Sequence, residues 1–250
     1  MRFFFDFLAA IWAEHPALFL LSPIFLLEGL YARAFTVKLP EAAGPRSGLA
    51  GSGPALRVLI VGDSAAAGVG VDQQQQALAG QVVQALQDSF TVQWKIVAAT
   101  GATTQSTISD LESCPVESHD VALTSLGVND VTSGVLLEDW LPQQARLLDL
   151  LRERFGVHLT LVTGFPPVHN FTALPQPLRW FMGRRSLRFH NALRELLARR
   201  KDCEFIELFL ADRPGMLAAD GFHPSAQTYA IWGKDAALRI MQHRSCDLRA

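Results

Sequence analysis

Three short patterns of glycine and polar residues contain the side chains of this sequence that are best suited to chemistry. They are Gly62-Asp63-Ser64, Gly127-Val128-Asn129-Asp130 and Asp220-Gly221-Phe222-His223. The first two follow runs of apolar residues and the third precedes a helical pattern, so all three are expected in loops. A serine, a histidine and an aspartate from separate loops are the residue types that make up a serine hydrolase site.

Ser64, His223 and Asp220 are the candidate catalytic residues. A serine hydroxyl is a weak nucleophile until an imidazole takes its proton, and the imidazole needs a third group that fixes its tautomer and steadies its charge. Asp220 and His223 are three residues apart, so both can project from one turn toward the same serine, and Pro224 begins the helix that follows. The sequence predicts Ser64 as nucleophile, His223 as base and Asp220 as the group that orients the base.

The same reaction needs hydrogen-bond donors for the oxyanion of the tetrahedral intermediate. The backbone N–H of Ser64 and the side-chain amide of Asn129 are suitable donors if their loops meet, and Gly101 is a candidate third donor through close backbone approach. The remaining acidic residues of the patterns are expected to be structural. Asp63 is predicted to stabilise its own turn, and Asp130 is predicted to cap the helix that follows it.

Apolar runs rich in Val, Ile and Leu alternate with helical patterns from residue 55 onward. Strands are predicted at 56–61, 92–98, 121–126, 159–163 and 205–208, and helices near 77–88, 104–111, 136–154, 187–200 and 224–243. This alternation predicts an α/β fold with a central five-stranded parallel sheet that helices cover on both faces. In such folds the working site lies beyond the carboxyl ends of the strands, where Ser64 and Asn129 are expected.

On these residues the sequence resembles the SGNH, or GDSL-type, hydrolases, from Leu56 to about His243. Gly62-Asp63-Ser64 matches the serine block of that family, Gly101 its glycine block, Gly127-x-Asn129-Asp130 its asparagine block and Asp220-x-x-His223 its last block. The resemblance implies a three-layer α/β/α, flavodoxin-like fold. It also implies hydrolysis of acyl esters, since the family includes lysophospholipases, thioesterases, arylesterases and carbohydrate deacetylases. The sequence contains no G-x-S-x-G nucleophile elbow, which argues against an α/β-hydrolase.

Length, composition and charge exclude several classes of protein. The 250 residues suit one compact domain with a sizeable core, since 49% of them are hydrophobic. The net charge of -2 does not supply the positive field that nucleic-acid binding needs. Cys114, Cys203 and Cys246 form neither a CxxC pair nor a disulfide framework, and the histidines show no metal-binding spacing. We therefore expect no metal, no cofactor and no nucleic-acid partner.

The stretch after the fourth predicted strand is rich in proline and aromatic residues. Phe165, Phe171 and Trp180 are candidates for the wall of an acyl pocket, although ordinary core packing accounts for them equally well. Eight of the 22 basic residues follow between Arg179 and Lys201. A solvated helix face is the default interpretation of this basic stretch, and contact with anionic lipid headgroups is the alternative.

The first 38 residues are the most apolar part of the chain. Their charge-free run from Pro16 to Leu27 has twelve residues, whereas a spanning helix needs about 20. Three interpretations stay open. The segment is a cleaved signal peptide with Ala32-Arg33-Ala34 as its cleavage site, a membrane-associated helix with Trp12 and Tyr31 at its ends, or a helix packed on the protein's own body.

The region between this segment and the predicted sheet has the composition of a linker. Residues 39–54 contain four glycines and three prolines and show no hydrophobic period. The sequence therefore divides into an apolar helical segment at 1–38, a linker at 39–54 and a hydrolase domain at 55–250.

Charge placement around the apolar run bears on localisation. Arg33, Lys38 and Arg46 follow the run, whereas only Arg2 precedes it, and basic flanks tend to stay in the cytoplasm. We expect a cytoplasmic protein that contacts the inner membrane peripherally through residues 1–31, by interfacial docking and not by a full span. Export by an N-terminal signal is the alternative.

The leading functional hypothesis is a serine hydrolase that cleaves carboxylic esters with apolar acyl groups through an acyl-enzyme. Its substrate would be a small-molecule or lipid ester, as for an esterase or lysophospholipase. A carbohydrate O-acetyl esterase is a second hypothesis. A third is a catalytically silent, membrane-associated binding protein with the same fold.

Overall fold

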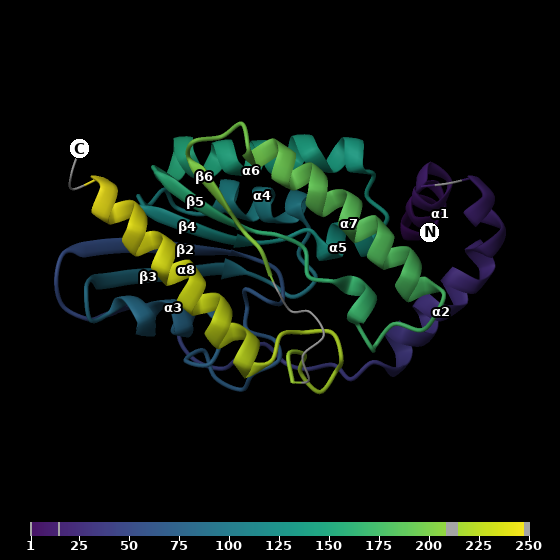
Figure 1. Cartoon of the computed structure of the whole chain (residues 1–250), viewed down its shortest axis with the longest axis horizontal. Coiled ribbons are helices and arrows are strands. Elements are labelled where there is room, and N and C mark those ends of the chain that lie inside the picture. Colours follow the sequence, from purple (N-terminus) through teal and green to yellow (C-terminus); the bar gives the residue numbers. More distant parts are fainter. Residues whose placement is uncertain (1, 15, 209–214, 248–250) are drawn as a thin grey trace.

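Six strands form the central sheet of the computed structural model, which describes residues 2–14, 16–208 and 215–247 (Figure 1). The strands are β1 (Ser47–Ala50), β2 (Ala55–Gly62), β3 (Thr91–Ala98), β4 (Val121–Ser125), β5 (Leu159–Thr163) and β6 (Cys203–Ile206). They lie in the order β1-β3-β2-β4-β5-β6, and β1 runs antiparallel to β3 whereas the other pairs are parallel. The predicted five parallel strands are confirmed as β2 to β6, and the sheet has one further, antiparallel edge strand.

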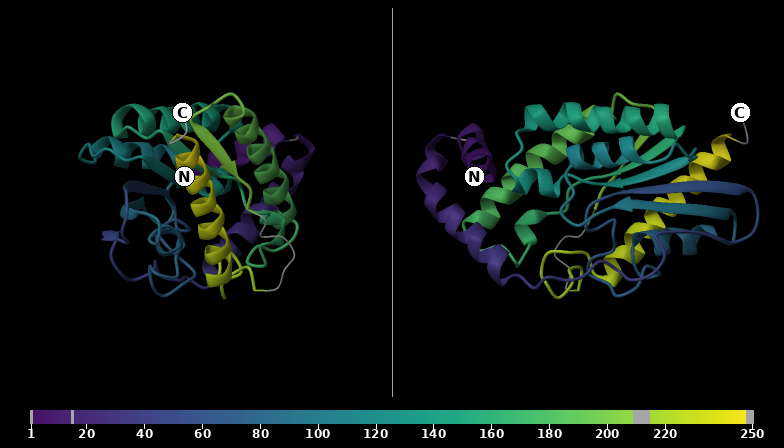
Figure 2. Two further views of the ribbon diagram at one scale, coloured as in Figure 1. Left: turned by 60° about the vertical axis from the view of Figure 1, so that its left-hand side comes forward. Right: turned by 180° about the vertical axis from the view of Figure 1, so that it is seen from behind.

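Helices cover both faces of this sheet and complete three layers. The α-helices are α1 (Arg2–Glu14), α2 (Ser22–Phe35), α3 (Leu78–Leu86), α4 (Thr104–Ser113), α5 (Val128–Thr132), α6 (Leu137–Phe155), α7 (Leu178–Leu197) and α8 (Ala226–Asp247). Two short 3-10 helices are η1 (Pro16–Leu21) and η2 (Val168–Asn170). α3 and α8 pack on one face, and α4, α6 and α7 lie on the other (Figures 1 and 2). The α/β/α fold class is confirmed.

The central position of β2 explains where the sheet places its functional loops. Leu56 and Ile60 are buried toward α3 and α8, whereas Leu59 and Val61 are buried toward α4 and α6. Because both faces are covered, the strand reads as a continuous apolar run and not as an alternating one. β2 lies between β3 and β4, so Ser64 follows it at the middle of the carboxyl edge of the sheet.

The predicted linker is wrong for part of its length. Ser47–Ala50 pairs with β3 as strand β1, and Glu41 accepts hydrogen bonds of 2.8 Å from both the backbone N–H and the hydroxyl of Thr100. The four residues SGLA show no strand pattern of their own. They form a strand because they pair with Thr91–Ala98, which lies far along the chain. Residues 39–54 therefore lie against the sheet instead of separating two bodies.

Two helices also differ from the prediction. α7 begins at Leu178, nine residues before the predicted start at residue 187, so part of the predicted aromatic connection is helical. Pro177 precedes this helix, at a position where the absent N–H of proline costs no intrahelical hydrogen bond. The five-residue helix α5 was not predicted because it is too short to show a hydrophobic period.

The N-terminal helices pack on the body at the end toward which the parallel strands point (Figures 1 and 2). Phe25 stacks on Phe181 of α7 with ring centroids 4.9 Å apart, and Phe7 meets the same ring edge-on at 6.2 Å. The Glu28 carboxylate accepts a 2.7 Å hydrogen bond from the backbone N–H of Leu178, the first residue of α7. The inner face of the segment is thus part of the folded core.

The continuous helical stretch Pro16–Phe35 has the length and the composition of a membrane-crossing helix. This stretch has 20 residues, whereas the charge-free run in the sequence has twelve and is too short for a spanning helix. The same stretch packs on α7 through one face, so length and composition alone do not decide how it is used.

Candidate active site

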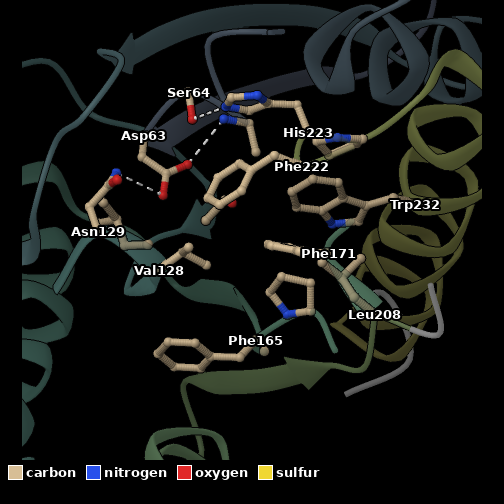
Figure 3. Close-up of a pocket in the computed structure, with 16 residues that line it drawn as sticks. Asp63, Ser64, Val128, Asn129, Phe165, Phe171, Leu208, Phe222, His223 and Trp232 are labelled. Atoms are coloured by element: carbon tan, nitrogen blue, oxygen red, sulfur yellow. Dashed lines mark hydrogen bonds between the residues drawn. The ribbon is translucent and has the colours of Figure 1, made fainter. Parts of the chain in front are cut away.

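Ser64, His223 and Asp220 form a hydrogen-bonded chain at the carboxyl edge of the sheet (Figure 3). The Ser64 Oγ lies 2.9 Å from the Nε2 of His223, and the Nδ1 of His223 lies 2.5 Å from the Oδ2 of Asp220. An ionised carboxylate only accepts hydrogen bonds, so Nδ1 carries the proton and Nε2 is left to accept from the serine hydroxyl. This is the order of contacts in which an imidazole can take a proton from serine.

The turn that carries Ser64 is held from two sides. Asp63 accepts a 3.1 Å hydrogen bond from the backbone N–H of Ala65, which confirms the predicted turn-stabilising contact. From α8, the hydroxyl of Tyr229 lies 3.0 Å from the carbonyl oxygen of Ala65 and 2.7 Å from that of Val69. The position of Ser64 is therefore tied to the same helix that follows His223.

The turn before α8 is organised by Asp220. Its Oδ1 accepts hydrogen bonds of 3.0 Å from the backbone N–H groups of Phe222 and His223, while its Oδ2 contacts the imidazole. Burial raises the pKa of Asp220, but the hydrogen bonds from the His223 ring and from the two backbone N–H groups outweigh it and leave the pKa below its ordinary value. Asp220 is therefore charged at neutral pH and able to stabilise a protonated imidazole.

Asn129 lies in α5, directly beyond β4. Its Nδ2 donates a 2.9 Å hydrogen bond to the carbonyl oxygen of Ala102, and the same nitrogen lies 3.5 Å from the Oδ2 of Asp63. Figure 3 shows Asn129 and Asp63 turned toward one another beside Ser64. The first hydrogen bond fixes the amide, and Asn129 lines the pocket that also contains Ser64.

The prediction that Asp130 caps the helix after it is wrong. Its carboxylate accepts instead from the backbone N–H of Thr104, at 3.1 Å, and from the Thr104 hydroxyl, at 3.0 Å, at the start of the earlier helix α4. The Thr104 hydroxyl in turn accepts from the Nε1 of Trp140 at 3.0 Å and from the Nε2 of Gln144 at 2.8 Å. Burial raises the pKa of Asp130 to about 6. This buried network fastens the segment that carries Asn129 to the start of α4.

The carboxyl group of Asp63 has a pKa that is raised further than that of Asp130. It is buried next to Ser64, and this burial raises its pKa to about 7, although the hydrogen bond from Ala65 and the neighbouring His223 act in the opposite direction. Near neutral pH the neutral and ionised forms of Asp63 are therefore both populated.

The pocket beside Ser64 has mostly apolar and aromatic walls. Two of the predicted wall residues, Phe165 and Phe171, line it. The third, Trp180, is wrong as a wall residue, because it lies on the exposed side of α7 with its ring 5.3 Å from the guanidinium of Arg184. Wall residues that the sequence did not reveal include Val128, Leu208, Phe222 and Trp232. Val128 and Phe222 directly precede Asn129 and His223, so their place in the patterns was an available signal.

Gly101 does not line the pocket. It has a φ of +82° in the turn after β3, where Glu41 holds the neighbouring Thr100. Of the three predicted donors, Ser64 and Asn129 line the same pocket, whereas Gly101 is exposed and does not line it.

The basic stretch from Arg179 to Lys201 is partly paired with carboxylates of the same chain. Arg185 and Arg188 both pair with Glu14 of α1, at 3.5 and 2.6 Å. Arg194 lies 3.7 Å from Glu207, and Arg200 pairs with Asp149 and Asp202. Four of the eight basic residues therefore pair with carboxylates, and among them Arg185 is buried whereas Arg188 and Arg194 remain half-exposed.

Metal ligands and reactive thiols are not gathered in the part of the chain that the structure describes. There, no group of three or more His, Cys, Asp and Glu side chains is placed to hold a metal ion. Cys203 is a free thiol whose pKa burial raises to about 12, and Cys114 is free and half-buried. Cys246 has no described side chain.

Comparison with known proteins identifies relatives of most of the chain. The family described as "GDSL-like Lipase/Acylhydrolase family" matches residues 60–231. The chain is 28% identical over 195 residues to the GDSL-like esterase Rv1075c of Mycobacterium tuberculosis, a match that covers 70% of this chain and 59% of that protein. The chain thus spans well under two thirds of the length of this curated relative.

Solved structures share the fold at low sequence identity. The crystal structure of TesA is 20% identical with a TM-score of 0.57, covering 72% of this chain and 95% of that one. Axe2, an acetylxylan esterase from Geobacillus stearothermophilus, is 17% identical with a TM-score of 0.52, covering 75% and 94%. A carbohydrate esterase family 2 enzyme from Corynascus thermopiles is 16% identical with a TM-score of 0.56, covering 81% and 68%. These likenesses show the fold alone.

Proposed function

Because the chain belongs to the GDSL-like lipase/acylhydrolase family, we propose that it hydrolyses carboxylic esters with Ser64 as the nucleophile. The observation that carries the proposal is the chain of contacts from Ser64 Oγ through His223 to Asp220, at 2.9 and 2.5 Å, inside an apolar pocket. Ser64, His223 and Asp220 act as a catalytic triad in this proposal.

The reaction proceeds in two steps. His223 Nε2 takes the proton of Ser64 Oγ as the oxygen attacks the ester carbonyl, and the resulting imidazolium passes that proton to the departing alcohol. The acyl group remains on Ser64 until water, deprotonated by His223, attacks the acyl-enzyme and releases the acid. Asp220 keeps the ring in the correct tautomer and stabilises its positive charge in both steps.

The oxyanion of each tetrahedral intermediate needs donors on the side of the pocket opposite His223. We assign this role to the backbone N–H of Ser64 and to the amide of Asn129, which its bond to Ala102 holds in place. A fixed donor of this kind stabilises the transition state because it needs no reorganisation as the charge develops.

The walls of the pocket favour an apolar acyl group. Phe165, Phe171, Phe222 and Trp232 present ring surfaces to the space beside Ser64 (Figure 3). An acyl chain placed there gains from burial of its apolar surface, at roughly 25 cal/mol per Å². A carbohydrate O-acetyl esterase is the alternative enzyme, and it would prefer acetylated sugars to longer acyl esters.

A fluorophosphonate probe tests the nucleophile directly. We expect one label per chain, on Ser64, because an imidazole-activated serine attacks phosphorus and an ordinary turn serine does not. Ser64→Ala should abolish labelling, whereas Ser125→Ala, which changes another serine of the same pocket, should retain it. Intact mass and peptide mapping give the result. A folded protein that takes no label would favour the silent binding protein.

A panel of nitrophenyl esters of increasing acyl length distinguishes the two enzyme hypotheses. Higher kcat/KM for longer acyl groups, lost in Ser64→Ala, would support the apolar acyl pocket. Activity confined to acetyl esters, with acetylated sugars preferred, would support the carbohydrate esterase.

A further inference from the structure

The outward side of the N-terminal helical stretch carries an apolar surface that the body does not cover. We call this surface the outer apolar face and define it by Leu20, Ile24, Leu27, Leu30, Tyr31 and Phe35. Leu20, Leu27 and Leu30 are 84%, 68% and 65% exposed. Positions 20, 24, 27 and 31 recur at intervals of three and four, so they lie along one side of the helical stretch.

The opposite side of the same stretch is fixed to the body. Phe25 is fully buried against Phe181, and Ser22 and Ala32 are buried as well. Glu28 satisfies the first backbone N–H of α7. These contacts orient the stretch, so the outer apolar face points away from the protein.

Charge around the outer apolar face is one-sided. Glu28 and Arg33 are the charged residues of Pro16–Phe35, and the carboxylate of Glu28 is turned to the Leu178 N–H. Arg33 is exposed in the last turn of α2, and Lys38 is exposed just beyond it. An apolar face with cations at its rim is complementary to a lipid surface with anionic headgroups.

Exposed aromatic pairs mark both ends of the stretch. Trp12 and Phe19 meet edge-on at 5.7 Å, and Tyr31 and Phe35 lie 4.7 Å apart. All four rings are exposed, and Trp and Tyr are enriched where a protein meets the headgroup region of a bilayer. Two such pairs would keep the axis of the stretch level with the interface.

From these observations we propose that the outer apolar face docks the protein on an anionic lipid surface, with Pro16–Phe35 lying in the plane of that surface. A spanning arrangement would detach Phe25 from the core, strip the Leu178 N–H of its acceptor and move Glu28 into hydrocarbon. A second copy of the chain is the competing occupant of this face, and the experiment distinguishes it from lipid.

The docking surface lies at the end of the molecule toward which the strands and their loops point (Figures 1 and 2). α7, on which the stretch packs, follows the loop that supplies Phe165 and Phe171 to the pocket. Docking therefore brings the carboxyl edge of the sheet toward the lipid. The docking itself does not depend on Ser64, so Ser64→Ala should bind lipid as the wild type does.

Vesicle flotation with the full chain tests the proposal. We expect the wild type to float with vesicles of phosphatidylcholine and phosphatidylglycerol, and to float less with phosphatidylcholine alone or in high salt. The triple variant Leu20→Ser, Leu27→Ser, Leu30→Ser should partition onto the vesicles at least about tenfold more weakly. Each change removes methyl groups that docking would bury in the lipid. Its matched control is Leu49→Ser, Val116→Ser, Leu238→Ser, at sites 70%, 62% and 54% exposed elsewhere on the surface, which should bind as the wild type does.

Several results would overturn the proposal. One is a wild type that stays in solution with anionic vesicles, and another is a triple variant that binds as well as its control. A chain that resists alkaline carbonate extraction would be a spanning protein. A dimer in light scattering that the triple variant abolishes, without vesicle binding, would mean that a second copy covers the face.

Discussion

Glu14 of α1 and Arg185 of α7 form an ion pair at 3.5 Å between two side chains that are 171 residues apart and buried. The guanidinium of Arg185 also donates to the carbonyl oxygens of Val131 and Val135, just after Asn129. Burial lowers the pKa of Arg185 to about 10, which leaves it charged at neutral pH and in need of its carboxylate partner. The first helix thus supplies the counter-charge for a cation that braces the segment next to the site.

Glu14→Gln should therefore lower the free energy of unfolding by about 3 kcal/mol, because removal of one partner leaves a buried charge uncompensated. Urea denaturation followed by circular dichroism measures the change. Arg188→Gln is the matched control, since Arg188 contacts the same carboxylate from a half-exposed position and its loss should cost about 1 kcal/mol or less. Equal losses in the two variants would contradict a special role for the buried partner.

Asn129→Ala should lower kcat by roughly 10² to 10³ and leave KM nearly unchanged, because an oxyanion donor acts mainly in the transition state. Steady-state kinetics with a nitrophenyl ester gives both constants. Asn191→Ala, on the exposed side of α7, should leave both unchanged. An effect on KM alone would mean that Asn129 holds substrate and does not stabilise the oxyanion.

Two glycines in left-handed conformations should respond differently to alanine. Around Gly101, with φ of +82°, an added Cβ meets open space, so Gly101→Ala should cost only the backbone strain of about 1 to 2 kcal/mol. At Gly127, with φ of +119°, the added Cβ would lie within 2.4 Å of the Phe165 ring, which adds about 1 to 3 kcal/mol of overpacking. Thermal unfolding of both variants measures the order, and a greater loss at Gly101 would refute this explanation.

Asp63 should make the stability of the wild type fall as pH rises. Its pKa in the folded protein is raised to about 7, so the unfolded chain gives up the proton first, and the stabilisation present below about pH 4 is lost as pH approaches 7. Asp63→Asn lacks this titration. Its stability relative to the wild type should increase by about 4 kcal/mol between about pH 4 and pH 7, as measured by urea denaturation at each pH. A relative stability that is constant with pH would contradict the perturbed carboxyl group.

The sequence alone predicts those elements whose pattern lies within a few neighbouring residues. The parallel strands read as apolar runs because helices cover both of their faces, and the rule that sites follow such strands brought Ser64 and Asn129 to one edge. The three-residue spacing of Asp220 and His223 predicts that both side chains project from one turn, and the structure has them in one turn. These contacts follow from residue type, spacing and fold class.

Contacts between distant segments were beyond the same reasoning. β1 exists only by pairing with β3, and Asp130 turned out to cap a helix that begins 26 residues earlier, at Thr104. Trp180 was assigned to the pocket because no pattern distinguished the two sides of a helix whose start was placed nine residues too late. In each case the missing information was the partner, which the local sequence does not encode.

The sequence separation of Ser64 and His223, 159 residues, has a consequence for how the protein becomes active. Ser64 is synthesised before His223, so in the proposed mechanism a chain whose synthesis has not reached His223 holds the nucleophile without the group that activates it. Completion requires closure of a very long loop and docking of α8, whose Tyr229 grips the serine turn. In refolding, we therefore expect ester hydrolysis to recover later than the spectroscopic signal of the helices. The delay would report when α8 docks.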